Sequence, residues 1–278
     1  WKFTAGMFLI SLISVLTQQS DKLILSNLVS INELGYYSLA FTLSILIVSS
    51  VSPFAVTMLP KLTAYFSEKN YKSAISLYTI FQKISLTIIF SISVNFIFFQ
   101  YEILFMWLDN TDIAKTVSLF ISFILMGYTF MAISVMPFNV AIANGYTVLN
   151  IRLGFFLFVI TTPLYYILIN KFGTLGAAYV FCFGQLIYIL IFYYIINKKF
   201  LKLNFNDLIL NPIIKPLIIC VLIVLVLKSA KPYLFDYRMF NVFYILFSIF
   251  SCLIITTLSS FKISELKSLS NKILNFEK

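Results

Sequence analysis

The sequence contains no histidine, and only 11% of its 278 residues are charged. The absence of histidine excludes imidazole metal sites and the Ser–His and Cys–His pairs of many hydrolases. The three cysteines, Cys182, Cys220 and Cys252, stand singly inside apolar runs, without the paired spacing of a zinc or redox site. We interpret them as small packing residues. We expect a protein that is not an enzyme, with no metal and no cofactor.

The scarcity of charge also excludes an ordinary soluble domain, which carries about 25% charged residues. Here 61% of the residues are hydrophobic, and the mean hydropathy is +0.98. Apolar runs of about 20 residues, the length needed to cross a bilayer, recur along the chain. We predict an all-α fold, a polytopic transmembrane helix bundle, with spans at residues 4–29, 35–59, 77–100, 116–143, 150–170, 174–196, 213–230 and 240–260.

The basic residues lie between the apolar runs. A net charge of +10 could suggest a nucleic-acid partner, but the lysines and arginines form no single basic face or arm, so none is expected. Lysine and arginine are concentrated in alternate loops, on the side that also holds both ends of this chain. The positive-inside rule places that side in the cytoplasm. Residues 61–78 and 261–278 are amphipathic, and we expect them to lie on the inner membrane surface, with partner binding as the alternative.

The first predicted span carries a polar stripe. At 100° per residue, one helical face collects polar side chains along most of its length: Thr4, Ser11, Ser14, Gln18, Asp21 and Lys22. A charged residue well inside a span costs roughly 2.5–3.5 kcal/mol unless it faces protein or water. We therefore expect this stripe to line a polar interior cavity. The alternative is that Asp21 and Lys22 snorkel to the outer headgroups.

Three further residues are candidates for the same cavity. Asn139 and Asn144 lie in an apolar region, where each could face a substrate or form an interhelical hydrogen bond. Arg152 opens the fifth predicted span. Its planar guanidinium suits a phosphate at the cytoplasmic mouth, although it could also be an ordinary positive-inside anchor.

Four segments together resemble one family. "QQSDKLILSNLVSINELGYYSLAFTLS" resembles the opening helix pair of the second lobe of polysaccharide-transporter flippases in the MOP exporter superfamily. "VSPFAVTMLPKLTAYFSEKNYKSA", "PFNVAIANGYTVLNIRLGFF" and "NKFGTLGAAYVFCFGQLIYIL" are similar to segments that follow in that family. The resemblance covers about residues 15–190. It implies that residues 1–197 are the core bundle of a C-terminal lobe, 198–260 two additional spans and 261–278 a cytoplasmic tail, with the N-terminal lobe preceding this chain.

The resemblance implies a flippase that carries undecaprenyl-pyrophosphate-linked oligosaccharide, an O-antigen, capsule or similar repeat unit, across the bacterial inner membrane by alternating access. Its partners would be that lipid-linked substrate, membrane lipids and other surface-polysaccharide assembly proteins. Lys22 and Arg152 would be cavity cations, and Asp21 their counter-ion or a coupling group. The alternatives are a multidrug or small-molecule exporter of the same superfamily, or a membrane-embedded glycan polymerase or transferase.

Overall fold

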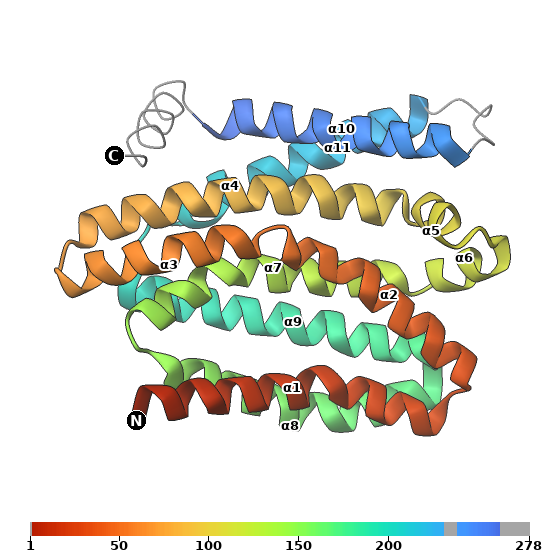
Figure 1. The fold of residues 1–278 in the computed structure, drawn as a ribbon, viewed down its shortest axis with the longest axis horizontal. Helices are drawn as coiled ribbons and strands as arrows, with labels where there is room; N and C mark the ends of the chain where they lie inside the picture. The colour runs from red at the N-terminus through yellow and green to blue at the C-terminus, as the bar shows by residue number, and fades with distance from the viewer. Residues whose placement is uncertain (1, 231–237, 262–278) are drawn as a thin grey trace.

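The structure is a computed structural model that describes residues 2–230 and 238–261, without the side chains of residues 2–7, 10, 13, 14, 17, 18, 238 and 239. Every regular element in these residues is a helix, which confirms the all-α prediction (Figure 1). Seven described segments are long and apolar enough to cross a membrane: Ile31–Ser67, Tyr71–Phe98, Ile121–Ala143, Thr147–Phe172, Thr174–Leu201, Asn206–Ala230 and Phe240–Ser260. Helix α1 (Lys2–Leu28), with 27 residues, runs alongside them.

The long helices pass back and forth along one direction (Figure 1). Helix α7 (Ile121–Ala143) is central and packs against α2 (Ile31–Ser49), α3 (Ser52–Ser67), α4 (Tyr71–Phe98) and α9 (Thr174–Ile196). Helix α8 (Thr147–Phe172) packs between α9 and α1. The start of α1 therefore lies at the same end of the bundle as the α3–α4 turn and the end of α9 (Figure 1).

Two late helices form a layer of their own. Helices α10 (Lys215–Ala230) and α11 (Arg238–Ser260) pack against each other and against α4, on the side away from α8 (Figure 1). At the opposite end from the α3–α4 turn, two short helices, α5 (Gln100–Leu108) and α6 (Thr111–Ser118), connect α4 to α7. The chain thus consists of a main bundle with one helix pair attached through α4.

The second predicted span, 35–59, is not one straight helix but is divided between α2 and α3. Proline lacks an N–H and is best tolerated in the first turn of a helix, and Pro53 lies in the first turn of α3. Two serine hydroxyls bond carbonyls beside the break: Ser50 Oγ donates to Ile47 O at 2.7 Å and Ser52 Oγ to Val48 O at 3.0 Å. The carbonyl groups of Ile47 and Val48 beside the break therefore have hydrogen-bond partners close by in the chain.

Residues 61–78, which we expected to lie on the inner membrane surface, do not form a helix of their own. Residues 61–67 continue α3, and after a short turn α4 begins at Tyr71, where the Asn70 side chain accepts a hydrogen bond from Ser73 N at 3.2 Å. The apolar face of this segment packs inside the protein, because Leu62, Phe66 and Tyr78 are buried in one cluster with residues of α7 and α9. Packing against other helices therefore accounts for the apolar face of this segment.

Helix α9 ends in a turn that redirects the chain. A π-helical turn, η1 (Asn197–Leu201), follows α9, and a second π-helical segment, η2 (Asn206–Ile214), leads into α10. The Asn197 side chain fixes the connection: its Nδ2 donates to Leu203 O at 3.0 Å, and its Oδ1 accepts from Leu203 N at 2.9 Å. Lys202 takes the left-handed conformation there, at φ 52°. This turn brings η2 against α4.

Candidate functional site

Asp21 is buried in the bundle and bonded through both carboxylate oxygens. The Tyr37 hydroxyl donates to Asp21 Oδ2 at 2.8 Å, and the backbone N–H of Lys22 donates to Oδ1 at 2.7 Å. Asp21 is 1% exposed and Tyr37 is fully buried. A buried carboxylate is costly without hydrogen-bond partners, so Tyr37 compensates for a large part of the burial of Asp21. The pair also joins α1 to α2.

The local sequence explains why these two residues meet. Asp21 lies about two turns before the end of α1, and Tyr37 lies about two turns after the start of α2. Helix α2 begins sharply because Ser30 and Glu33 form a capping box, in which Ser30 N donates to Glu33 Oε2 at 2.9 Å and Glu33 N to Ser30 Oγ at 3.3 Å. In the "SINELGYY" stretch, the glutamate therefore caps the helix and the second tyrosine binds the aspartate.

Aromatic side chains from several helices surround this pair. The Tyr37 ring lies 4.8 Å from that of Phe41 between centroids, and Phe41 lies 5.5 Å from Tyr128 and 4.9 Å from Phe181. Tyr128 on α7 and Tyr165 on α8 are buried in the same cluster. Helices α2, α7, α8 and α9 thus form a largely apolar shell with tyrosine hydroxyls as its polar groups. Water is excluded from the carboxylate, so its electrostatic interactions are strong.

Lys22 lies in a different environment from Asp21. Its side chain is half-buried, and its Nζ lies 5.2 Å from the centroid of the Phe41 ring, a cation–π contact. Phe41 contacts Tyr37, so one aromatic ring connects the lysine to the residue that binds Asp21. Asp21, Lys22, Tyr37 and Phe41 therefore form one cluster, which we call the hairpin cluster.

The rest of the predicted stripe is only partly described. Ser11 is exposed, and the side chains of Thr4, Ser14 and Gln18 lie outside the described residues. On the same helix, Leu9, Leu12 and Leu16 are exposed, as lipid-facing residues would be. Asp21 itself is packed among protein side chains. That the stripe as a whole lines a cavity stays a prediction.

Asn139, Asn144 and Arg152 lie away from the hairpin cluster. The two asparagines donate from Nδ2 to carbonyls one turn back on their own helix, to Val135 O and Val140 O, each at 2.8 Å. Arg152 is exposed near the start of α8, about 20 Å along that helix from Tyr165. The candidate residues therefore form two groups, one at the α1–α2 hairpin and one around the α7–α8 turn.

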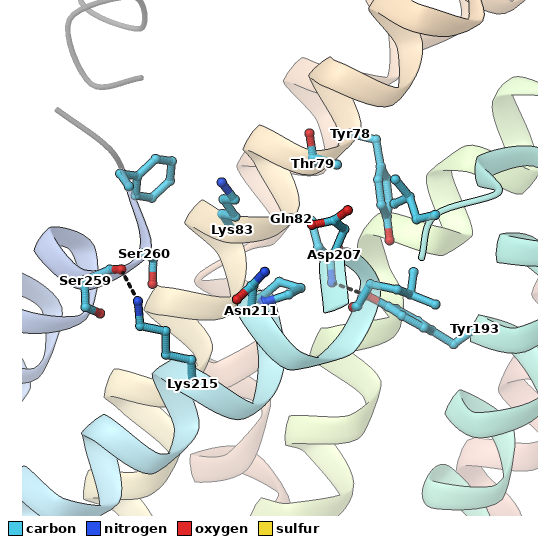
Figure 2. Close-up of a pocket in the computed structure, with 14 residues that line it drawn as sticks. Tyr78, Thr79, Gln82, Lys83, Tyr193, Asp207, Asn211, Lys215, Ser259 and Ser260 are labelled. Carbon is cyan, nitrogen blue, oxygen red and sulfur yellow. Dashed lines mark hydrogen bonds between the residues drawn. The ribbon is translucent and has the colours of Figure 1, made fainter. Parts of the chain in front are cut away.

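A second polar region was missed by sequence reasoning. A pocket of about 480 Å³ opens between α4, η2 and the ends of α9 and α11 (Figure 2). Its polar lining includes Tyr78, Gln82, Lys83, Asp207, Asn211 and Lys215. The sequence held one indication of this region, the two adjacent polar residues Gln82 and Lys83 inside the third predicted span. They come together with Asp207 and Lys215 only because the Asn197 turn folds η2 back against α4.

Comparison of the sequence with known protein families found no match, and no curated protein matches it significantly.

Proposed function

We propose that this chain is the second lobe of a flippase that moves undecaprenyl-pyrophosphate-linked oligosaccharide across the bacterial inner membrane by alternating access. The observation that carries the proposal is the buried Asp21 carboxylate bonded to Tyr37 inside a bundle of membrane-length helices. Ionisable residues at such positions are costly and characteristically mark transport pathways. Both residues belong to the segment that resembles the opening helix pair of these flippases.

The hairpin cluster supplies a contact that alternating access can break and remake. Alternating access needs two discrete helix arrangements that the substrate or a coupling ion biases. The Tyr37–Asp21 hydrogen bond joins α1 to α2, while α1 packs more extensively on α8. Neutralising Asp21 would weaken the bond and release the hairpin, so Asp21 is the coupling group of this proposal.

Arg152 and Lys22 supply positive charge at two levels. Arg152 is exposed at the end of the bundle where the loop lysines gather, and its guanidinium can hold a phosphate in a bidentate manner. Lys22 lies deeper, about 20 Å further along α1 and α8. A pyrophosphate would meet Arg152 first and Lys22 later, which orders the path from the cytoplasm toward the far side.

The test uses a bacterium that lacks its own oligosaccharide-lipid flippase and expresses the full-length protein. Surface glycan and trapped lipid-linked oligosaccharide are measured for the wild type, Asp21→Ala, Lys22→Ala and Arg152→Ala at matched membrane expression. The control is Lys171→Ala, because Lys171 is an exposed cation at the other end of α8. We expect the control to behave as wild type and the other variants to export roughly tenfold less, as for the loss of about 1.4 kcal/mol of binding.

Two outcomes would contradict the proposal. Rescue by the wild type and by all three variants would show that these charges are anchors and not part of the path. Failure of the well-expressed wild type with every matched glycan, accompanied by resistance to organic cations, would instead favour a small-molecule exporter.

A further inference from the structure

The pocket beside α4 lies at the level of the lipid headgroups. About 20 residues of helix cross the hydrocarbon core, and counting back that far from Phe98, the last residue of α4, reaches Thr79. Lys83 is one turn inside this boundary, where its long side chain can reach the headgroup level, and α11 ends at Ser260 beside the same pocket. The pocket therefore opens where the phosphate and head of a phospholipid would be.

One side of the pocket carries the positive charge. Lys215 Nζ donates to Ser259 O at 2.7 Å, and Lys83 Nζ lies 5.6 Å from the centroid of the Phe261 ring, so both ammonium groups gather at the end of α11 (Figure 2). The Ser260 hydroxyl is buried there without a hydrogen-bond partner in the described part of the chain. Two cations and a hydroxyl donor form a suitable surface for a phosphate.

The other side carries hydrogen-bond acceptors. Gln82 is 2% exposed, and its Nε2 donates to the Tyr193 hydroxyl at 3.2 Å, which in turn donates to Leu208 O at 3.3 Å (Figure 2). This chain of hydrogen bonds leaves Gln82 Oε1 buried with no donor among residues 2–230 and 238–261. The carboxylate of Asp207 lines the same side. A buried acceptor is destabilising until a donor reaches it.

We propose that this pocket binds the phosphoethanolamine headgroup of a membrane phospholipid. The phosphate lies against Lys83, Lys215 and Ser260, and the ammonium group donates to Gln82 Oε1 and faces Asp207. A volume of about 480 Å³ accommodates the headgroup together with its glycerol. Choline has no N–H to donate to Gln82 Oε1. The glycerol headgroup of phosphatidylglycerol can donate a hydroxyl but has no positive charge to face Asp207, so both lipids should bind more weakly. The inference does not depend on the flippase proposal.

The experiment measures which lipids remain bound to the purified full chain. The protein is reconstituted with equal amounts of phosphatidylethanolamine, phosphatidylcholine and phosphatidylglycerol, extracted, and weighed by native mass spectrometry. We expect preferential retention of phosphatidylethanolamine, reduced roughly tenfold in Lys83→Gln/Lys215→Gln, a loss that corresponds to one decade in Kd. The matched control is Lys228→Gln, because Lys228 Nζ bonds Phe98 O at 2.9 Å, a similar lysine–carbonyl contact at the far end of α10.

Asp207→Asn tests the ammonium side without disturbing the core, because Asp207 is exposed. It should reduce the preference for phosphatidylethanolamine over phosphatidylglycerol and leave phosphatidylglycerol binding unchanged. Equal retention by the double variant and by the Lys228→Gln control would overturn the proposal, as would equal retention of phosphatidylcholine. If soluble O-phosphoethanolamine displaced the lipid at comparable concentration, the site would belong to a soluble phosphorylated amine and the lipid assignment would fail.

Discussion

The hairpin cluster shows how a single carboxylate is accommodated inside an apolar bundle. Asp21 has one local partner, the N–H of Lys22, and one distant partner, the hydroxyl of Tyr37. Only the distant partner depends on the tertiary fold, because Lys22 is the next residue in the chain whereas Tyr37 lies on another helix. The strength of the cluster should therefore depend on Tyr37.

Replacing Tyr37 with phenylalanine keeps the ring and removes only the hydroxyl. We expect Tyr37→Phe to lower the free energy of unfolding by about 1.5–3 kcal/mol, as for the loss of a hydrogen bond to a charged group. A detergent-unfolding titration in micelles measures the change, and Tyr36→Phe, at the half-buried neighbouring position, is the control. In an Asp21→Asn background, Tyr37→Phe should lower the free energy of unfolding by less. An equal loss in both backgrounds would mean that the hydroxyl acts independently of Asp21.

At the scale of elements, helices α8 and α9 approach each other closely because a glycine lies between them. A Cβ added at Gly176 would stand 2.1 Å from Leu168 O and 2.5 Å from Leu168 C, both backbone atoms. Backbone cannot yield as a flexible side chain can. The contact is thus specified by the absence of a side chain at one position.

Gly176→Ala should force α8 and α9 apart and destabilise the protein by about 1–3 kcal/mol, the usual cost of overpacking. The control is Gly35→Ala on α2, where an added Cβ meets nothing within 4 Å. That substitution should stabilise its helix by about 0.5–1 kcal/mol, because alanine loses less backbone entropy than glycine. Both are measured by the same unfolding titration. Similar changes in the free energy of unfolding for the two substitutions would show that the close packing of α8 and α9 does not require a glycine at position 176.

The segment around residues 61–78 shows where pattern alone misleads at this scale. A helix with one apolar face can rest on a membrane or pack on other helices, and the periodicity is the same in both cases. Here Leu62, Phe66 and Tyr78 meet Met136 and Phe192 inside the protein. Those partners lie far along the chain, so the pattern could not distinguish the two arrangements.

For the whole molecule, the α3–α4 turn and the α5–α6 turn lie at opposite ends of the bundle (Figure 1). Lys69 is in the first turn, and Asp109 is in the second; both are exposed. Lysines gather at the first end, which the positive-inside rule assigns to the cytoplasm. This orientation can be tested on intact cells.

Single cysteines at Lys69 and Asp109 are introduced into a protein whose three buried native cysteines are replaced by alanine. A membrane-impermeant maleimide should label Asp109→Cys once the outer membrane is permeabilised. It should label Lys69→Cys only after the inner membrane is permeabilised as well. The opposite pattern would invert the bundle and place Arg152 at the outer mouth, which would contradict the proposed order of the substrate path.

The sequence by itself determined the fold class and the lengths and positions of most spans, and it singled out Asp21 as a candidate site residue. It could do so because bilayer thickness imposes a length on each apolar run, and because a charge in such a run stands out without any partner being known. The tertiary structure decided that Asp21 pairs with Tyr37, and that Gln82, Lys83, Asp207 and Lys215 share one pocket. These groupings depend on which helices pack together and how the turns redirect the chain, and such long-range contacts leave no periodic signal in the sequence.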